Sequence, residues 1–406
     1  MTEKTVPSPA VFLKGTATLL VLAVLNISCW HLFFSPKGIM RLYTPMYGFS
    51  IIVVLLAAVV TFSDLFDGWP LGGGDDSQPS AVRGVGLTLL SLGLAWFLIF
   101  GLFYNFIGRF GITYFSPASI VATGETGSEI FNARENASTA LVYLFAAYIW
   151  LALTWRLGFR AWPWDKIGAG AVAFSRLAAV SVFSMIAYAV LFHPHVGVLF
   201  YPPQKMAAVS PWWEAIADTN SAYYHLGWVV CSVAIVIFSE TLWEEYPWRL
   251  IGGVERKTPL LRGVATFIGT VVLGFIIFYA MKIGMEGYWG KPFVGGQYVD
   301  APYFRYLHAA EMAGFMILGA FIVKIYLGNL FTGSVPVVSG IVRTIIAVAL
   351  GALIMWFYYA AGPVVFGTVQ GIAQPEDTPL CWSFFMITFI LVHKNFFNSF
   401  PLRSAS

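Results

Sequence analysis

Charged side chains are scarce in this sequence, and their scarcity excludes most soluble folds. Asp, Glu, Lys and Arg make up 11% of the 406 residues, whereas apolar residues make up 58%. A soluble chain cannot bury so large an apolar share, so several segments must face lipid. The bases form no run of the kind that binds nucleic acid. We therefore expect the lipid bilayer as a partner and no nucleic acid, and we leave further membrane or periplasmic subunits open.

Cysteine is scarce as well, and no short motif indicates a zinc or nucleotide site. Cys29, Cys231 and Cys381 lack CxxC spacing, which argues against a zinc knuckle or a thioredoxin-like site. In the topology predicted below, Cys29 and Cys381 lie on one side, either as a disulfide or as two separate buried thiols. The glycines at 72–74 are followed by acids and not by Gly-Lys-Ser/Thr, so they form no phosphate loop.

Long apolar runs are what the sequence has in abundance. A helix that crosses a bilayer needs about 20 mostly apolar residues, and an open sheet edge cannot be satisfied in lipid. The sequence therefore predicts an all-α integral membrane protein with about ten transmembrane helices in a single polytopic domain, 1–406. The predicted segments are about 11–34, 44–66, 83–107, 137–158, 169–192, 221–242, 262–283, 306–328, 339–361 and 380–397.

Lys and Arg concentrate in every second connection and at both ends of the chain. Cytoplasmic connections are enriched in these two residues. We therefore expect a multi-pass protein of the cell membrane, the inner membrane in a bacterium, with both termini cytoplasmic. The longer connections, which are rich in Gly, Pro and aromatic residues, would then form outer loops at about 108–136, 193–220, 284–305 and 362–379.

Two of the predicted cytoplasmic turns resemble each other. Phe-Ser-acid opens both, at 62–64 and 238–240, and Arg-Gly-Val closes them from Arg83 and Arg262. The similarity predicts a same-sense duplication of a four-helix unit, helices 2–5 and 6–9, related by an axis along the membrane normal. Helices 1 and 10 would flank these units. Weaker echoes of the turn at 155–176, at 327–343 and near the C-terminal end leave open that each unit is built from two-helix hairpins. The alternative is that cytoplasmic turns share such residues without duplication. The predicted repeats cover residues 43–200 and 221–366.

Glu240, Arg262 and Arg83 make this turn a candidate site in its own right. Glu240 stands near Glu244, Glu245 and several bases. We interpret the turn as a salt-bridged element that holds two helices at a fixed angle. The alternative is a cytoplasmic gate or docking site.

A second set of candidates lies near the predicted outer face. Glu135 and Glu311 each begin the third helix of a predicted unit, and His225 and His308 lie near the same side. Charged groups inside a membrane are costly and tend to be functional. We expect these four side chains to line a substrate pathway, with helix capping and charge pairing as the alternative for the two acids.

Histidines of this outer layer raise the question of a metal or haem. His193, His195 and His308 have ring nitrogens suited to zinc, copper or iron. No fixed ligand spacing such as HExxH accompanies them. The sequence therefore requires no cofactor, and interfacial histidines are the alternative to a metal or haem site.

Three functional classes follow from these observations. The first is a permease or secondary transporter of a small solute, without its own nucleotide-binding site and without enzymatic activity. The second is a membrane subunit of a redox or metal-handling complex that works with haem, copper or quinone. The third is a membrane-embedded, lipid-modifying enzyme in which Glu135, Glu311 and His308 would act as acids and bases. No residue is assigned a catalytic role on the sequence alone.

Overall fold

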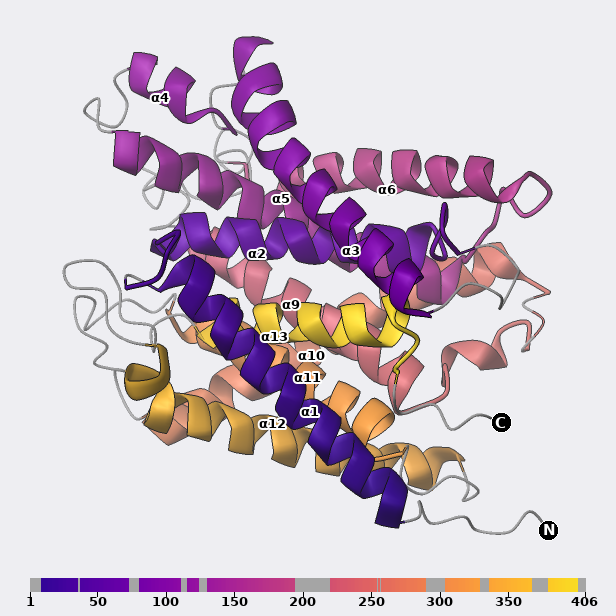
Figure 1. Cartoon of the computed structure of the whole chain (residues 1–406). Coiled ribbons are helices and arrows are strands. Elements are labelled where there is room, and N and C mark those ends of the chain that lie inside the picture. Colours follow the sequence, from indigo (N-terminus) through magenta and orange to yellow (C-terminus); the bar gives the residue numbers. More distant parts are fainter. Residues whose placement is uncertain are drawn as a thin grey trace.

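The structure is a computed structural model, and every regular element that it describes is a helix (Figure 1). Ten helices are long and apolar enough to cross a membrane, and each overlaps one predicted segment. The prediction of about ten helices of that kind in an all-α chain is confirmed. The described residues are 9–35, 37–72, 80–110, 115–123, 130–193, 220–253, 255, 257–289, 304–328, 336–366 and 379–400.

The fourth spanning helix shows the largest difference from its predicted bounds. It begins at Ile130 and not near 137, because Asn132, Arg134 and Glu135 in its first turns lower the local hydropathy without breaking the helix. Proline begins several of the other helices, where its fixed φ suits the first helical turn and its missing N–H is not needed. The spanning helices are α1 (Pro9–Cys29), α2 (Pro45–Val60), α3 (Ser80–Trp96), α5 (Ile130–Gly158), α6 (Ala169–Leu191), α9 (Asn220–Thr241), α10 (Pro259–Trp289), α11 (Phe304–Phe321), α12 (Pro336–Phe366) and α13 (Pro379–Leu391).

Short helical pieces extend five of these helices or stand beside them. Several are π-helical, with hydrogen bonds that span five residues in place of four. They are η1 (Trp30–Phe34), η2 (Thr61–Leu65), η3 (Phe97–Phe106), η4 (Ile107–Phe110), α4 (Pro117–Thr123), η7 (Trp248–Leu250), η8 (Ile322–Tyr326) and η10 (Val392–Phe396).

Inner and outer helices alternate along the chain. In α2, α5, α9, α11 and α13, between 72 and 94% of the most apolar stretch is buried inside the protein, against 11 to 28% in α1, α3, α6, α10 and α12. The second group exposes large aliphatic side chains such as Ile276 and Ile345. We call the first group the inner helices and the second the outer helices.

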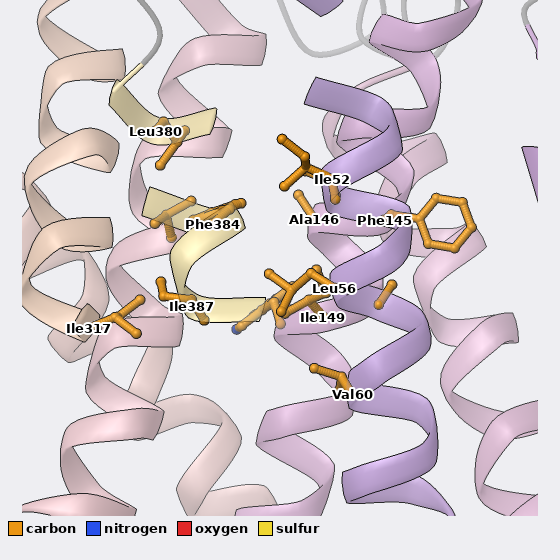
Figure 2. Packing of buried hydrophobic residues seen from close by; sticks show 14 of the residues in the cluster. Ile52, Leu56, Val60, Phe145, Ala146, Ile149, Ile317, Leu380, Phe384 and Ile387 are labelled. Carbon is orange, nitrogen blue, oxygen red and sulfur yellow. The ribbon is translucent and has the colours of Figure 1, made fainter. Parts of the chain in front are cut away.

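The inner helices form a closed ring. α2 packs against α5, α5 against α9, α9 against α11, α11 against α13, and α13 against α2 again. Figure 2 shows how Leu56 of α2, Ile149 of α5 and Ile387 of α13 lie between these helices. The apolar core is therefore annular, and the outer helices surround it.

Small residues let outer and inner helices approach closely. A Cβ on Gly319 of α11 would lie 2.0 Å from the Ala347 carbonyl oxygen of α12, and one on Gly274 of α10 would lie 2.1 Å from Ser232 Oγ of α9. Small residues at such crossings are typical of helix pairs in membranes, where close van der Waals contact replaces the hydrophobic effect.

The inner helices all end in the same way, at what we call the turn end of the molecule. The residue that follows the last helical turn adopts a left-handed conformation, which stops the helix. Its φ lies between 50° and 68° in each of the five cases: Asp67, Arg160, Glu244, Gly328 and Asn398. In four of the five turns a backbone N–H then bonds the carbonyl three residues earlier, as in Trp69 to Phe66 (2.9 Å) and Tyr246 to Trp243 (2.9 Å).

Buried arginines of the outer helices bind these turns. Arg176 of α6 donates to the Leu65 carbonyl (2.9 Å) and to Asp67 (2.9 Å), in the turn after α2. Arg343 of α12 donates to the Leu242 carbonyl (3.1 Å), in the turn after α9. Each guanidinium thus satisfies helix-terminal carbonyls that have no partner within their own helix.

Two further arginines of outer helices, the buried Arg262 and the partly buried Arg83, are the predicted turn residues. Arg83 of α3 donates to Asn398 (3.4 Å) in the turn after α13, which joins the beginning of the chain to its end. Arg262 of α10 donates to Glu245 (2.5 Å) and to the Gly253 carbonyl (3.0 Å). The interpretation of the turn as an ion-paired element between helices agrees with these contacts.

Both ends of the described chain lie at the turn end. Gly15, near the start of α1, touches the backbone of Tyr326 at the end of η8, and η10 ends beside α3. The cytoplasmic side of this end stays a prediction, as does the duplication of helices 2–5 and 6–9. Cys29, Cys231 and Cys381 are all free thiols, so the disulfide alternative is not realised in the structure.

We expect Arg262→Ala to lower the free energy of unfolding by about 1.5–3 kcal/mol, because hydrogen bonds to a charged group are lost at a fully buried side chain. Unfolding in mixed micelles, followed by circular dichroism, measures the change. The matched control is Lys257→Ala, which removes an ion pair with Glu255 in which both side chains are 76% exposed. Equal stability of the two variants would contradict the anchoring role.

Candidate functional site

A cavity lies within the ring, and the described residues that line it belong to the inner helices and to η2 and η10, which extend two of them. Its volume is about 40 Å³, which is room for a few water molecules. Fourteen of its eighteen lining side chains are apolar. The lining residues are Leu56, Val60 and Asp64 after α2; Ala146, Ile149, Leu153 and Arg156 on α5; Val229, Val230, Val233, Ile237 and Glu240 on α9; Ile317 and Phe321 on α11; and Phe384, Ile387, Leu391 and Lys394 from α13 onward.

The four charged lining residues, Asp64, Arg156, Glu240 and Lys394, all lie at the turn end of the cavity, and we call them the girdle. Arg156 forms an ion pair with Asp64, and its Nη1 lies 3.6 Å from Glu240 Oε2. The Asp64 side chain is 2% exposed and so is buried, whereas Glu240 and Arg156 are partly buried, at 15% and 35% exposed. Arg156 therefore bridges two acids that come from the helices on either side of α5.

Lys394 completes the girdle from the α13 side. Its ammonium nitrogen lies 5.7 Å from the ring centroid of Phe321, a cation–π arrangement. Lys324 of η8 is half-buried and occupies the corresponding place at the end of α11. Four of the five inner helices thus place a charged side chain at the mouth of the cavity, and Lys324 has the equivalent position in sequence on the fifth.

The girdle charges lie in a recurring pattern of aromatic residues, which the weaker resemblances among the turns already indicate in the sequence. In four of the turns an eight-residue stretch has an aromatic residue at its fourth and seventh places and Pro at its eighth. The stretches are SDLFDGWP from Ser63, RLGFRAWP from Arg156, ETLWEEYP from Glu240 and KNFFNSFP from Lys394. Three of them begin on a girdle residue, and in the first the girdle residue is second. The stretch after α11, KIYLGNLF from Lys324, keeps the base and lacks the proline.

Glu240 is the one girdle residue among the predicted sites. The sequence places it with Glu244 and Glu245, but the structure separates them. Glu240 faces the cavity, whereas Glu245 pairs with Arg262 and Glu244 lies 3.6 Å from Arg249 and 3.4 Å from Arg343. Of the three acids in this turn, one therefore faces the cavity and two bind arginines outside it.

Glu135 caps the start of α2. Its carboxylate accepts hydrogen bonds from the Thr44 hydroxyl and from the Met46 N–H (2.9 Å). The neighbouring Arg134 guanidinium lies 4.4 Å from the centre of the Tyr47 ring. A carboxylate at a helix N-terminus satisfies free N–H groups and interacts favourably with the helix dipole. Capping, the alternative reading of this residue, is what these contacts support.

Glu311 and His308 form a buried pair on α11. His308 Nδ1 lies 2.7 Å from Glu311 Oε2, and the Tyr359 hydroxyl of α12 lies 3.5 Å from the same oxygen. Glu311 is 2% exposed. The pair lies between an inner and an outer helix, and neither Glu135 nor Glu311 is among the residues that line the central cavity.

His225 and the proposed metal ligands have separate surroundings. The Trp228 indole N–H donates to His225 Nδ1 over 2.8 Å, within α9. His193 lies against the Tyr188 ring, with centroids 6.0 Å apart, and His195 lies outside the described residues. Among the residues that the structure describes, no three His, Cys, Asp or Glu side chains gather as metal ligands would. A metal or haem at His193, His195 and His308 stays a prediction.

Comparison with family models, with curated proteins and with solved structures finds no match for this chain.

We expect Asp64 and Arg156 to stabilise the fold jointly. In a double-mutant cycle of Asp64→Asn and Arg156→Gln, the coupling energy should be about 0.5–2 kcal/mol, because the Asp64 side chain is only 2% exposed, while water partly screens Arg156, whose side chain is 35% exposed. Unfolding in mixed micelles measures it. The exposed pair Glu255 and Lys257 is the control and should show little coupling. Additive effects at the buried pair would contradict the bridge.

Glu135→Ala should lower the free energy of unfolding by about 0.5–2 kcal/mol through loss of the α2 cap. Glu135→Gln should cost less, because its amide oxygen still accepts the Met46 N–H. Thermal unfolding of the two purified variants compares them. A Gln variant with unchanged stability and no transport in reconstituted vesicles would instead support the pathway role that the sequence suggests.

Proposed function

We propose that the chain is a membrane permease or channel that passes a small solute along the axis of the inner-helix ring, without a nucleotide-binding site of its own. One observation carries the proposal: all five inner helices contribute to one cavity, and the cavity bears charge at only one end. Bundles whose helices serve only as structure have no need of buried ion pairs around a central space, because such pairs are expensive to bury.

The membrane setting supports the proposal from the outside of the ring. Outer helices expose aliphatic side chains along their length, including Val272 (51%), Ile276 (59%) and Leu353 (58%). These faces suit lipid tails, while the inner ring is shielded from lipid. A path for a polar solute would then run where lipid is excluded.

In our proposal, the small volume of the cavity and the ion pairs of the girdle correspond to a closed solute path. The volume accommodates a few waters at most, and Arg156 joins α2, α5 and α9 at the mouth. Passage requires these ion pairs to separate and the ring to widen. In our proposal the girdle is therefore the gate, and the turn end is the cytoplasmic end, since Arg160, Arg249 and Lys257 also lie there.

We also propose that the repeated unit is a hairpin of one inner helix, a turn and one outer helix. The alternation of buried and lipid-facing helices, the shared left-handed residue and the recurring eight-residue stretch support five such units. In this arrangement α13 and α1 together make the fifth unit, with the chain ends at its turn. Each predicted four-helix unit, helices 2–5 and helices 6–9, would then consist of two such hairpins.

The pathway can be tested before any solute is known. In a background with Cys29, Cys231 and Cys381 changed to Ala, we expect Val233→Cys to react with a charged methanethiosulfonate reagent in reconstituted vesicles. Ile276→Cys on the lipid face of α10 should not react, because a thiol in lipid does not ionise. Arg156→Gln should raise the rate at Val233→Cys by opening the girdle.

Mass spectrometry of the labelled protein gives both rates, and size-exclusion chromatography checks that each variant is folded. If folded Val233→Cys protein stayed as unreactive as Ile276→Cys, with and without Arg156→Gln, the axial path would be wrong.

A further inference from the structure

The connection between α1 and α2 lies at the end of the molecule opposite the turn end. α1 and η1 form one apolar helix of 25 residues that ends at Phe34, and α2 begins at Pro45. A helix of that length rises about 37 Å, slightly more than the roughly 30 Å of a hydrocarbon core. Residues 37–42, which we call the α1–α2 loop, therefore lie at the level of the lipid headgroups.

Backbone hydrogen bonds fold the α1–α2 loop back onto the end of η1. The N–H groups of Ile39 and Met40 both donate to the Leu32 carbonyl, over 3.1 and 3.2 Å. A Cβ on Gly38 would lie 2.1 Å from the His31 carbonyl oxygen, so the close approach of the two backbones requires a glycine here. The loop is thus a compact turn that holds its tip beside Leu32.

This tip is apolar and lies between two bases. Ile39 is 80% exposed and Met40 is 52% exposed. Lys37 precedes them and Arg41 follows them, and both bases are exposed as well. Arg41 Nε donates to the Gly38 carbonyl (3.3 Å), which brings its guanidinium back to the residue that follows Lys37. Two cations therefore flank one apolar tip on the same short loop.

Neither topology nor ion pairing accounts for the two bases of the loop. With the turn end cytoplasmic, as proposed above, the loop lies on the outer side, where Lys and Arg are not enriched. Within the part of the chain that the structure describes, neither base forms an ion pair. The neighbouring acid, Glu135, binds the Thr44 hydroxyl and the Met46 N–H instead. An external anion is the partner that these bases suit.

The apolar tip continues the lipid-facing side of α1 and η1. Only 11% of the most apolar stretch of this helix is buried, and Leu25 and Leu32, seven residues apart on one face, are 48% and 40% exposed. Since Ile39 lies beside Leu32, the exposed apolar surface runs from the helix onto the loop. A protein partner suits this tip less well, because two side chains supply far less than the roughly 800 Å² that each partner of a stable interface buries.

We propose that the α1–α2 loop is a binding site for an anionic phospholipid in the leaflet opposite the turn end. Ile39 and Met40 lie at the boundary between acyl chains and headgroups, and Lys37 and Arg41 bind the phosphate. The guanidinium fits two phosphate oxygens at once, and the ammonium adds a point charge. A zwitterionic headgroup binds less well, because its own cation competes for the phosphate.

This site is independent of the proposed solute path. None of the described residues that line the central cavity belongs to α1, to η1 or to the loop. The two proposals can therefore fail separately.

Photoreactive lipids test the site in the full chain. The protein is reconstituted into nanodiscs that contain either a phosphatidylglycerol or a phosphatidylcholine with a diazirine near the glycerol end of one acyl chain. After illumination, mass spectrometry quantifies the cross-linked peptides that contain residues 37–42. We expect the yield with phosphatidylglycerol to exceed that with phosphatidylcholine by about fivefold or more at equal mole fraction, since one base near an anionic surface contributes about fivefold in affinity.

Charge-removing variants show whether the two bases select the headgroup. Lys37→Gln combined with Arg41→Asn should lower the phosphatidylglycerol yield at the loop to the phosphatidylcholine level, and each single variant should lie between. Asn suits position 41, where φ is 50°. The matched control is Lys257→Gln combined with Arg160→Asn, which removes the same charges at the turn end, where Arg160 also has a positive φ of 55°. It should leave the yield at the loop unchanged, and size-exclusion chromatography checks that every variant is folded.

Three results would overturn the proposal. Equal yields for the two lipids in the wild type, or an unchanged phosphatidylglycerol yield in the folded double variant, would mean that the bases select no headgroup. No cross-link to either lipid would mean that the loop lies away from the bilayer and leave a protein partner as its occupant. Glycerol 3-phosphate in molar excess should not compete, and loss of the lipid preference in its presence would assign the site to a soluble phosphate ester.

Discussion

The last carbonyl groups of a helix need hydrogen-bond donors, and an apolar environment provides none. In this protein arginines from neighbouring helices donate to the turns: Arg176 to Leu65, Arg343 to Leu242 and Arg262 to Gly253. Arg176 and Arg343 each reach the turn of a different hairpin from their own and so join one helix pair to the next, whereas Arg262 binds the turn that leads into its own helix. The ring of inner helices, and the cavity inside it, depend on these links and on the small residues that let the helices approach.

Hydropathy predicts the ten helices well because lipid imposes a length and a composition that the sequence displays directly. It does not separate inner from outer helices, since both kinds are apolar all round and overlap in mean hydropathy. The ring is decided by which faces meet, and that depends on small residues and turn geometry rather than on composition. The turn at 238–264 was recognisable as a recurring element, with its match at 62–85 and weaker echoes elsewhere, and the turns that begin at Arg156 and Lys394 share its aromatic spacing.

The candidate site was predicted only at Glu240. Asp64, Arg156 and Lys394 are ordinary in sequence, because bases and acids near a cytoplasmic helix end are expected from the topology alone. Their convergence is a property of five helix ends brought together, and no single segment shows it. Glu135 and Glu311 were easy to select from the sequence, because charged residues are rare in or beside apolar segments. In the structure, however, Glu135 caps α2 and Glu311 pairs with His308. An isolated charge in an apolar segment is as easily a helix cap as a transport residue.

Each turn serves the ring and the girdle at the same time. In the turn after α9, Glu240 faces the cavity while Glu245, five residues on, holds Arg262 of an outer helix. After α2, Asp64 faces the cavity while Asp67 holds Arg176. A shift of an outer helix at its arginine therefore pulls on a backbone segment of fewer than two helical turns that also positions a girdle acid. The residues that anchor the outer helices and the acids at the mouth of the cavity thus lie on the same short segments of backbone.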